Sequence, residues 1–156
     1  MDFKPTNMKV DFNEFFSSSA KCMKPSAIRA LLSVVNQPGV ISFAGGFPNP
    51  ETFPIEDLKT IMMEVLEEEG AKALQYGGTD GNWALREELA KRYVNEGLDI
   101  DKDNIIITTA SQQAIDLTAK VLLDPGDIVI CGLPSYLGAL QAFSTYQAKL
   151  VGAEKD

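Results

Sequence analysis

One short polar turn has residue types and spacing suited to binding an anion. Ala110-Ser111-Gln112-Gln113 follows the β-favouring run 105–109 and precedes a helical pattern of apolar residues. In an α/β sheet, ligands bind at the carboxyl ends of the strands, where the next helix presents free backbone N–H groups and the positive end of its dipole. We therefore expect a phosphate here, with the Ser111 hydroxyl as a further donor. The simpler alternative is that Ser111 only caps the helix, which contributes about 1 kcal/mol.

Tyr136 is a second candidate binding residue. It follows the apolar run 128–131, which predicts the next strand, so we expect it at the same edge of the sheet as Ser111. A tyrosine there could lie flat on a planar ring whose phosphate occupies the 110–112 turn. The alternative is a core tyrosine at a helix start. Nucleotide binding has less support, because neither GxxxxGK[ST] nor GxGxxG follows the strand.

The elements that must position these residues alternate between strand and helix patterns. Such alternation indicates βαβ units and a mostly parallel sheet covered by helices on both faces. About three central strands are too few for a complete doubly wound sheet. Helices are expected over 26–35, 55–69, 82–95, 111–123 and 135–148, and strands at 40–43, 74–76, 104–109, 128–131 and 149–152.

The composition narrows the functional classes. Hydrophobic residues make up 45% and charged residues 23%, as in ordinary soluble globular proteins. The net charge of -8 argues against nucleic-acid binding, and the absence of histidine excludes His-based triads and His metal sites. Cys22 and Cys131 lie far apart and in no metal-binding or redox spacing. With no signal-peptide pattern and no apolar run near 18 residues, we expect a cytoplasmic protein with free thiols and no membrane contact.

Four blocks of the sequence form a recognisable series. They are 25-PSAIRALL-32, 40-VISFAGGFPNPETFP-54, 74-LQYGGTDGNWALREELA-90 and 107-ITTASQQAIDLTAKVLLDPGD-127, continued by 134-PSYLGALQAF-143. Together they resemble the N-terminal part of a fold-type I aminotransferase that depends on pyridoxal 5'-phosphate (PLP), in the branch that contains the α-aminoadipate (LysN-like), kynurenine and aromatic aminotransferases. The likeness runs from about residue 20 to the end of the chain, in matching order and spacing.

The resemblance implies an α/β fold of the PLP-dependent transferase type, present here in part. Residues 1–24 would form an N-terminal arm, 25–54 an N-terminal helix and substrate loop of the small domain, and 55–156 the first part of the large PLP-binding domain. The implied enzyme moves an amino group from an amino acid, such as 2-aminoadipate or an aromatic amino acid, to a 2-oxo acid such as 2-oxoglutarate. It would act as a homodimer.

The resemblance also assigns the cofactor-binding residues. The backbone amides of Ala110, Ser111 and Gln112 and the Ser111 hydroxyl would bind the cofactor phosphate, and Tyr136 would stack on the pyridine ring. Tyr76 resembles the tyrosine that reaches the phosphate in the neighbouring subunit. Relatives usually have glycine where this chain has Ala110. Alanine keeps every amide, so we expect phosphate binding to survive unless this position needs a positive φ.

Four further residues are assigned to the substrate by resemblance. Gly45 and Gly46 would let the backbone approach the substrate, while Ser26 and Arg29 would lie on a mobile helix that recognises the substrate side chain. A guanidinium suits a distal carboxylate because it pairs with it through two hydrogen bonds. Without the family context, Arg29 is equally well explained as an exposed helix arginine.

The catalytic residues of the family have no matching position before Asp156. They are the Schiff-base lysine, the aspartate at the pyridinium nitrogen, the asparagine and tyrosine at the ring oxygen, and the arginine for the α-carboxylate. Lys21 superficially resembles the Schiff-base lysine, but it precedes the first predicted strand and is not assigned. We therefore expect a truncated, proteolysed or split chain, inactive alone, whose open sheet edge is completed by the remainder of the fold.

Two other functions stay open. One is a non-catalytic regulator that binds PLP or an amino acid as a signal, although residues 1–24 are too short for the DNA-binding domain that such regulators usually carry. The other is a different fold-type I PLP enzyme, such as a lyase or decarboxylase.

Overall fold

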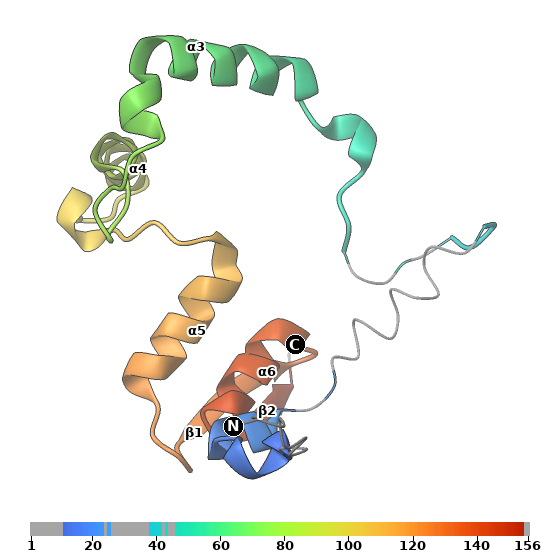
Figure 1. The fold of residues 1–156 in the computed structure, drawn as a ribbon. Coiled ribbons are helices and arrows are strands. Elements are labelled where there is room, and N and C mark those ends of the chain that lie inside the picture. The colour runs from blue at the N-terminus through green and yellow to red at the C-terminus, as the bar shows by residue number, and fades with distance from the viewer. Residues whose placement is uncertain (1–10, 24, 26–37, 42, 44–45, 155–156) are drawn as a thin grey trace, which may run out of the picture. The chain divides into compact units, whose positions relative to one another are not determined.

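The computed structural model describes residues 11–23, 25, 38–41, 43 and 46–154 (Figure 1). The contacts divide the chain into two compact units. One unit combines Met1–Ala30 with Ala110–Asp156, and the other is Leu31–Thr109. The helix predicted over 26–35 lies outside the described residues.

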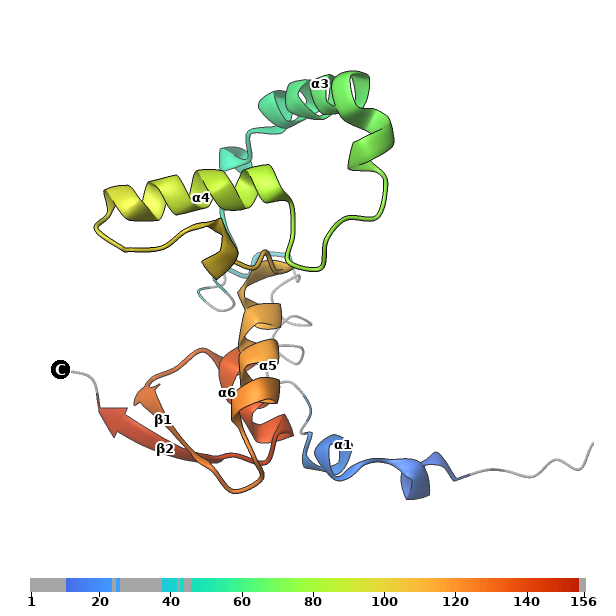
Figure 2. The same cartoon turned by 90° about the vertical axis from the view of Figure 1, so that its left-hand side faces the viewer.

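The first unit is built on two parallel strands joined by a helix. β1 (Ile128–Leu133) pairs with β2 (Lys149–Glu154) in a register that runs from Ile128↔Lys149 to Leu133↔Glu154. This confirms the predicted parallel pairing and the βαβ unit. α6 (Leu137–Thr145) is the crossover helix, and α5 (Ala110–Leu122) precedes β1. Figure 2 shows both helices on the same side of the two strands.

The core of this unit lies between the helices and one face of β1. Ala119 of α5, Cys131 of β1 and Ala142 of α6 are buried there. The opposite face of β1 carries Ile128 and Ile130, which are exposed. Strand side chains alternate between faces, so α5 and α6 cover one face of the pair.

The N-terminal segment belongs to the same unit. η1 (Phe12–Phe15) and α1 (Ser18–Cys22) are both short, and α1 contacts α6. The Ser17 hydroxyl caps α1 by accepting the Ala20 N–H at 3.1 Å.

The second unit contains two longer helices. α3 (Ile55–Ala73) continues one turn beyond its predicted end, although Glu69 has non-helical angles of φ -130° and ψ 18°. α4 (Trp83–Asn95) follows the prediction closely. Its N-cap residue, Asn82, accepts the Leu85 N–H at 3.0 Å, and Gly97, at φ 92°, follows its end. Two short turns complete the unit: η2 (Pro50–Thr52) and η3 (Lys102–Asn104).

Three predicted strands are wrong in the described part of the chain. Val40, Ile41 and Phe43 lie in no strand, and Leu74 ends α3 where the strand 74–76 was expected. The run 104–109 begins in η3 and then continues without a strand assignment. A strand needs neighbouring N–H and C=O groups to pair with, and within the described residues only β1 and β2 pair as strands.

Three wider features concern the whole described chain. Cys22 is exposed, Cys131 is buried, and both are free thiols, as predicted. None of the described helices has the length and apolar character needed to cross a membrane. Among the same residues, no group of His, Cys, Asp and Glu is arranged to hold a metal ion.

Candidate functional site

The predicted anion-binding turn forms the N-terminus of α5. Ala110, Ser111 and Gln112 are the first three residues of this helix, and all three are exposed. The first N–H groups of an α-helix have no carbonyl partner within the helix, and they lie at the positive end of its dipole. The structure therefore places these residues where an anion can approach them.

Ala110 adopts a backbone conformation that favours glycine. Its φ is 60°, in the left-handed region. The position therefore adopts the positive φ that was the exception to the expectation that phosphate binding survives with alanine here. An L-residue in this region costs about 1–2 kcal/mol, so alanine keeps the backbone of the turn but destabilises it relative to glycine.

The start of α6 lies beside the start of α5. The Gln112 side-chain Nε2 donates a hydrogen bond to the Gly138 carbonyl at 3.1 Å. Tyr136 is the N-cap residue of α6, and 57% of its surface is exposed. The structure thus brings Gln112 and Tyr136 to neighbouring helix starts, although the strand predicted before Ser111 is missing from the described part of the chain.

Gly138 makes this close approach possible and was not predicted as a site residue. A Cβ atom at this position would overlap the Gln112 Oε1 and would lie 2.6 Å from the Tyr136 Cε1. A side chain here would therefore displace Gln112 or the Tyr136 ring. The only sequence signal was a glycine within a predicted helix, two residues after the tyrosine.

Further hydrogen bonds hold the start and the end of α6. The Ser135 hydroxyl donates to the Gly132 carbonyl at 2.6 Å, between β1 and α6. The Tyr146 hydroxyl, just after α6, donates to the Asp116 Oδ1 on α5 at 3.2 Å. Burial raises the pKa of Tyr146, and the hydrogen bond to Asp116 acts in the same direction. The phenol therefore stays protonated and keeps this link between the helices at neutral pH.

Tyr76 lies in the other unit, in the loop between α3 and α4. The residue is 99% exposed, and its backbone N–H donates to the Gln75 Oε1 at 2.8 Å. The loop lines a cavity of about 650 Å³ together with the end of α3 and the start of α4. The ring is therefore accessible to another molecule, while the loop backbone belongs to its own unit.

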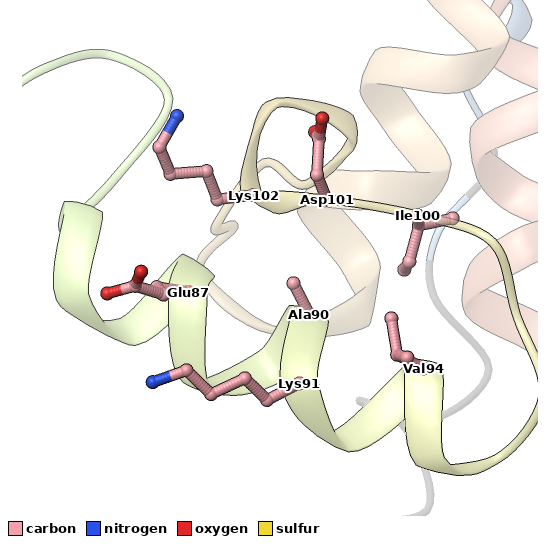
Figure 3. Close-up of a pocket in the computed structure, with 7 residues that line it drawn as sticks. All are labelled: Glu87, Ala90, Lys91, Val94, Ile100, Asp101 and Lys102. Atoms are coloured by element: carbon pink, nitrogen blue, oxygen red, sulfur yellow. The ribbon is translucent and has the colours of Figure 1, made fainter.

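A second hollow lies along α4 and contains none of the predicted site residues. Figure 3 shows apolar side chains at one end and charged side-chain ends at the other. The Lys91 ammonium bonds Glu88 at 2.7 Å, and this hydrogen bond raises the pKa of Lys91. Exposed and mutually paired charges of this kind are typical of a solvated helix face. The hollow measures about 380 Å³ and is lined by Glu87, Ala90, Lys91, Val94, Ile100, Asp101 and Lys102.

The predicted substrate residues fall mostly outside the described chain. Ser26, Arg29 and Gly45 are not described, and their assigned roles stay predictions. Gly46 has a φ of 61°, which a residue with a side chain rarely adopts. A conformational reason for glycine therefore exists at this position, while its contact with a substrate stays a prediction.

Comparison with known proteins places the chain in a defined group. A family model described as "Aminotransferase class I and II" matches residues 38–155. Aromatic-amino-acid aminotransferase 1 of Thermococcus litoralis is 48% identical over 144 residues, which cover 91% of this chain and 34% of the relative.

Solved structures give the same result. The kynurenine aminotransferase of Pyrococcus horikoshii matches with a TM-score of 0.84 and 45% identity, covering 94% of this chain and 36% of that one. LysN, the α-aminoadipate aminotransferase of Thermus thermophilus, matches with a TM-score of 0.77 and 39% identity, covering 93% and 35%. The chain spans about a third of the length of these relatives.

Proposed function

Because the chain belongs to the class I and II aminotransferases, we propose that it supplies the phosphate-binding side of a PLP-dependent aminotransferase. Membership in this family confirms the resemblance and the fold class predicted from the sequence, with the fold present in part. The proposed reaction transfers an amino group from an amino acid to a 2-oxo acid.

The observation that carries the proposal is the pairing of two helix starts around Gln112. The exposed N-terminus of α5 suits a phosphate, because backbone N–H groups and the helix dipole both favour an anion. The Gln112 bond to Gly138 holds the Tyr136 segment next to it. An anion site beside an exposed aromatic ring matches the two ends of PLP, a phosphate and a planar ring. The residues present therefore fit this cofactor.

Each residue has a distinct task in this proposal. With PLP bound, Ser111 and the neighbouring amides would hold the phosphate, and the Tyr136 ring would shield the pyridine from water. Gln112 orients the Tyr136 segment through Gly138. The bound cofactor would supply an electron sink for the amino acid. The chain thus binds and orients the group on which the chemistry depends.

The substrates and the assembly are proposed from the relatives rather than from contacts within this chain. The relatives carry the names aromatic-amino-acid, kynurenine and α-aminoadipate aminotransferase, so we propose an aromatic amino acid or 2-aminoadipate as amino donor, with 2-oxoglutarate as acceptor. We also propose a homodimer in which the exposed Tyr76 contacts the phosphate of the neighbouring subunit. The free thiols of Cys22 and Cys131 support a cytoplasmic location.

The phosphate role of Ser111 can be tested with two related ligands. We expect Ser111→Ala in the full-length protein to weaken PLP binding about tenfold, because one hydrogen bond to a charged group is lost. Binding of pyridoxal, which lacks the phosphate, should change less than about twofold. Ser144→Ala, the same change on α6, is the matched control. Calorimetric titration of both ligands gives the comparison, and an equal loss for the two ligands would refute the assignment.

A further inference from the structure

Arg86 carries a charge and is buried, unlike the other charged side chains in the described part of the chain. It lies in α4, and only 7% of its surface is exposed. Within the described residues its Nε is buried without a hydrogen-bond partner, so the guanidinium is held by its two terminal nitrogens. Burying a charged group is unfavourable unless it is paired, so the contacts of these two nitrogens determine its role.

The two terminal nitrogens bind segments on either side of α4. Nη2 pairs with the Asp80 Oδ2 at 2.5 Å, in the loop before the helix. Nη1 donates to the Lys102 carbonyl at 3.0 Å and lies 3.8 Å from the Asp103 Oδ1, in η3 after the helix. One planar guanidinium therefore ties the loop after Tyr76 to the segment that follows α4.

Asp80 makes a second link between the same two segments. Its backbone carbonyl accepts the Ile107 N–H at 3.0 Å. Gly81 has a φ of 99°, and a Cβ there would lie 2.5 Å from the Ile107 Cβ. A Cβ at Gly78 would lie 2.6 Å from the Asp80 Oδ1. The glycines thus leave room for Asp80 to contact Arg86 with its side chain and Ile107 with its backbone.

The loop held by these contacts carries a proposed phosphate-binding residue. Tyr76 stands four residues before Asp80. We infer that Arg86 and Asp80 are positioning residues that fix the Tyr76 loop against the 102–107 segment, so that Tyr76 is presented to the cofactor phosphate of the neighbouring subunit. This inference rests on the proposed phosphate-binding role of Tyr76.

The same helix provides a matched control. Arg92 is exposed over 74% of its side chain and pairs with Glu96, four residues along the helix, at 3.3 Å. It contacts neither the loop before α4 nor η3 in any interaction that the structure records for it. Replacing arginine by lysine at either position keeps the charge. At position 86, lysine loses the forked geometry that contacts Asp80 and Lys102 together.

The test measures PLP and pyridoxal binding to the full-length protein. We expect Arg86→Lys and Asp80→Asn each to weaken PLP binding about tenfold, as for the loss of one charge-assisted contact, and to leave pyridoxal binding within about twofold. Arg92→Lys should change neither. The double variant Asp80→Asn/Arg86→Lys should resemble the single variants, because both changes disrupt one arrangement.

The outcomes separate a positioning role from a structural one. If the variants lower the unfolding temperature while the preference for PLP over pyridoxal is unchanged, Arg86 only stabilises the fold and the inference is wrong. If the wild-type protein itself does not prefer PLP, the proposed function fails, and the inference fails with it. Should Arg86→Lys not fold, Gly78→Ala tests the same arrangement, because its Cβ displaces the Asp80 carboxylate while both charges remain. Unchanged PLP preference in Gly78→Ala likewise overturns the inference.

Discussion

Ala110→Gly should stabilise the protein, although an alanine to glycine change in a helix usually does the opposite. Ala110 has a φ of 60° at the start of α5. Glycine relieves a left-handed strain of about 1–2 kcal/mol. Its greater freedom in the unfolded chain costs about 0.4–1 kcal/mol. The net gain in the free energy of unfolding is therefore on the order of 0.5–1 kcal/mol, from the difference between these two estimates.

The matched control is Ala114→Gly, one turn further along α5. Ala114 lies inside the helix and does not have a positive φ. Among the described residues other than glycine, positive φ angles occur at Ala110 and Gln147. The same chemical change should therefore destabilise the protein by roughly 0.5–1 kcal/mol at position 114. For a chain of 156 residues, a 1 kcal/mol change shifts the unfolding temperature by about 2–4 °C.

The assay is thermal unfolding of both variants beside the wild type, followed by PLP titration. Opposite shifts of the unfolding temperature are expected. PLP affinity of Ala110→Gly should stay within about twofold of wild type, because the backbone amides of the turn are retained. Equal destabilisation by both substitutions would refute the left-handed conformation of Ala110 and the strain argument built on it.

The remaining predictions concern the contacts that join α5 to α6. Gly138→Ala should weaken PLP binding about tenfold in a titration, because its methyl group displaces Gln112 or the Tyr136 ring, whereas Gly70→Ala, in open space within α3, should not weaken it. Tyr146→Phe should lower the unfolding temperature by removing the hydrogen bond to Asp116, and Tyr93→Phe on α4 serves as its control. The pKa of Tyr146 is raised in the folded protein, so its contribution to the free energy of unfolding should be complete below the normal tyrosine pKa of about 10. That contribution should be lost as the pH rises through the pKa of Tyr146 in the folded protein. The loss of stability at alkaline pH should therefore be smaller in Tyr146→Phe.

Helices were predictable from the sequence where local signals sufficed. α4 and α5 combine a clear apolar period with recognisable ends, such as Asn82 and Gly97 around α4. The run 104–109 has strong β propensity but lies in no strand, because pairing depends on a neighbour and not on the segment itself.

The sequence predicted the proposed ligand-binding residues of the site but not the residues that position them. Ser111 and Tyr136 were identified because each follows a predicted strand, and the structure places the starts of α5 and α6 together. The bonds that join Gln112 to Gly138 and Arg86 to Lys102 link residues 16 or more positions apart, for which the sequence contains no local period. The left-handed conformation of Ala110 likewise follows from its surroundings, because alanine alone does not favour it.

The most direct test of the central claim is to follow the backbone amides of α5 while PLP is added. In ¹⁵N-labelled full-length protein, we predict that the amide signals of Ser111 and Gln112 shift on titration with PLP, and that pyridoxal produces much smaller shifts at both. Unchanged Ser111 and Gln112 signals at saturating PLP, with shifts confined to other residues such as those along α4, would contradict the claim that the start of α5 binds the cofactor phosphate.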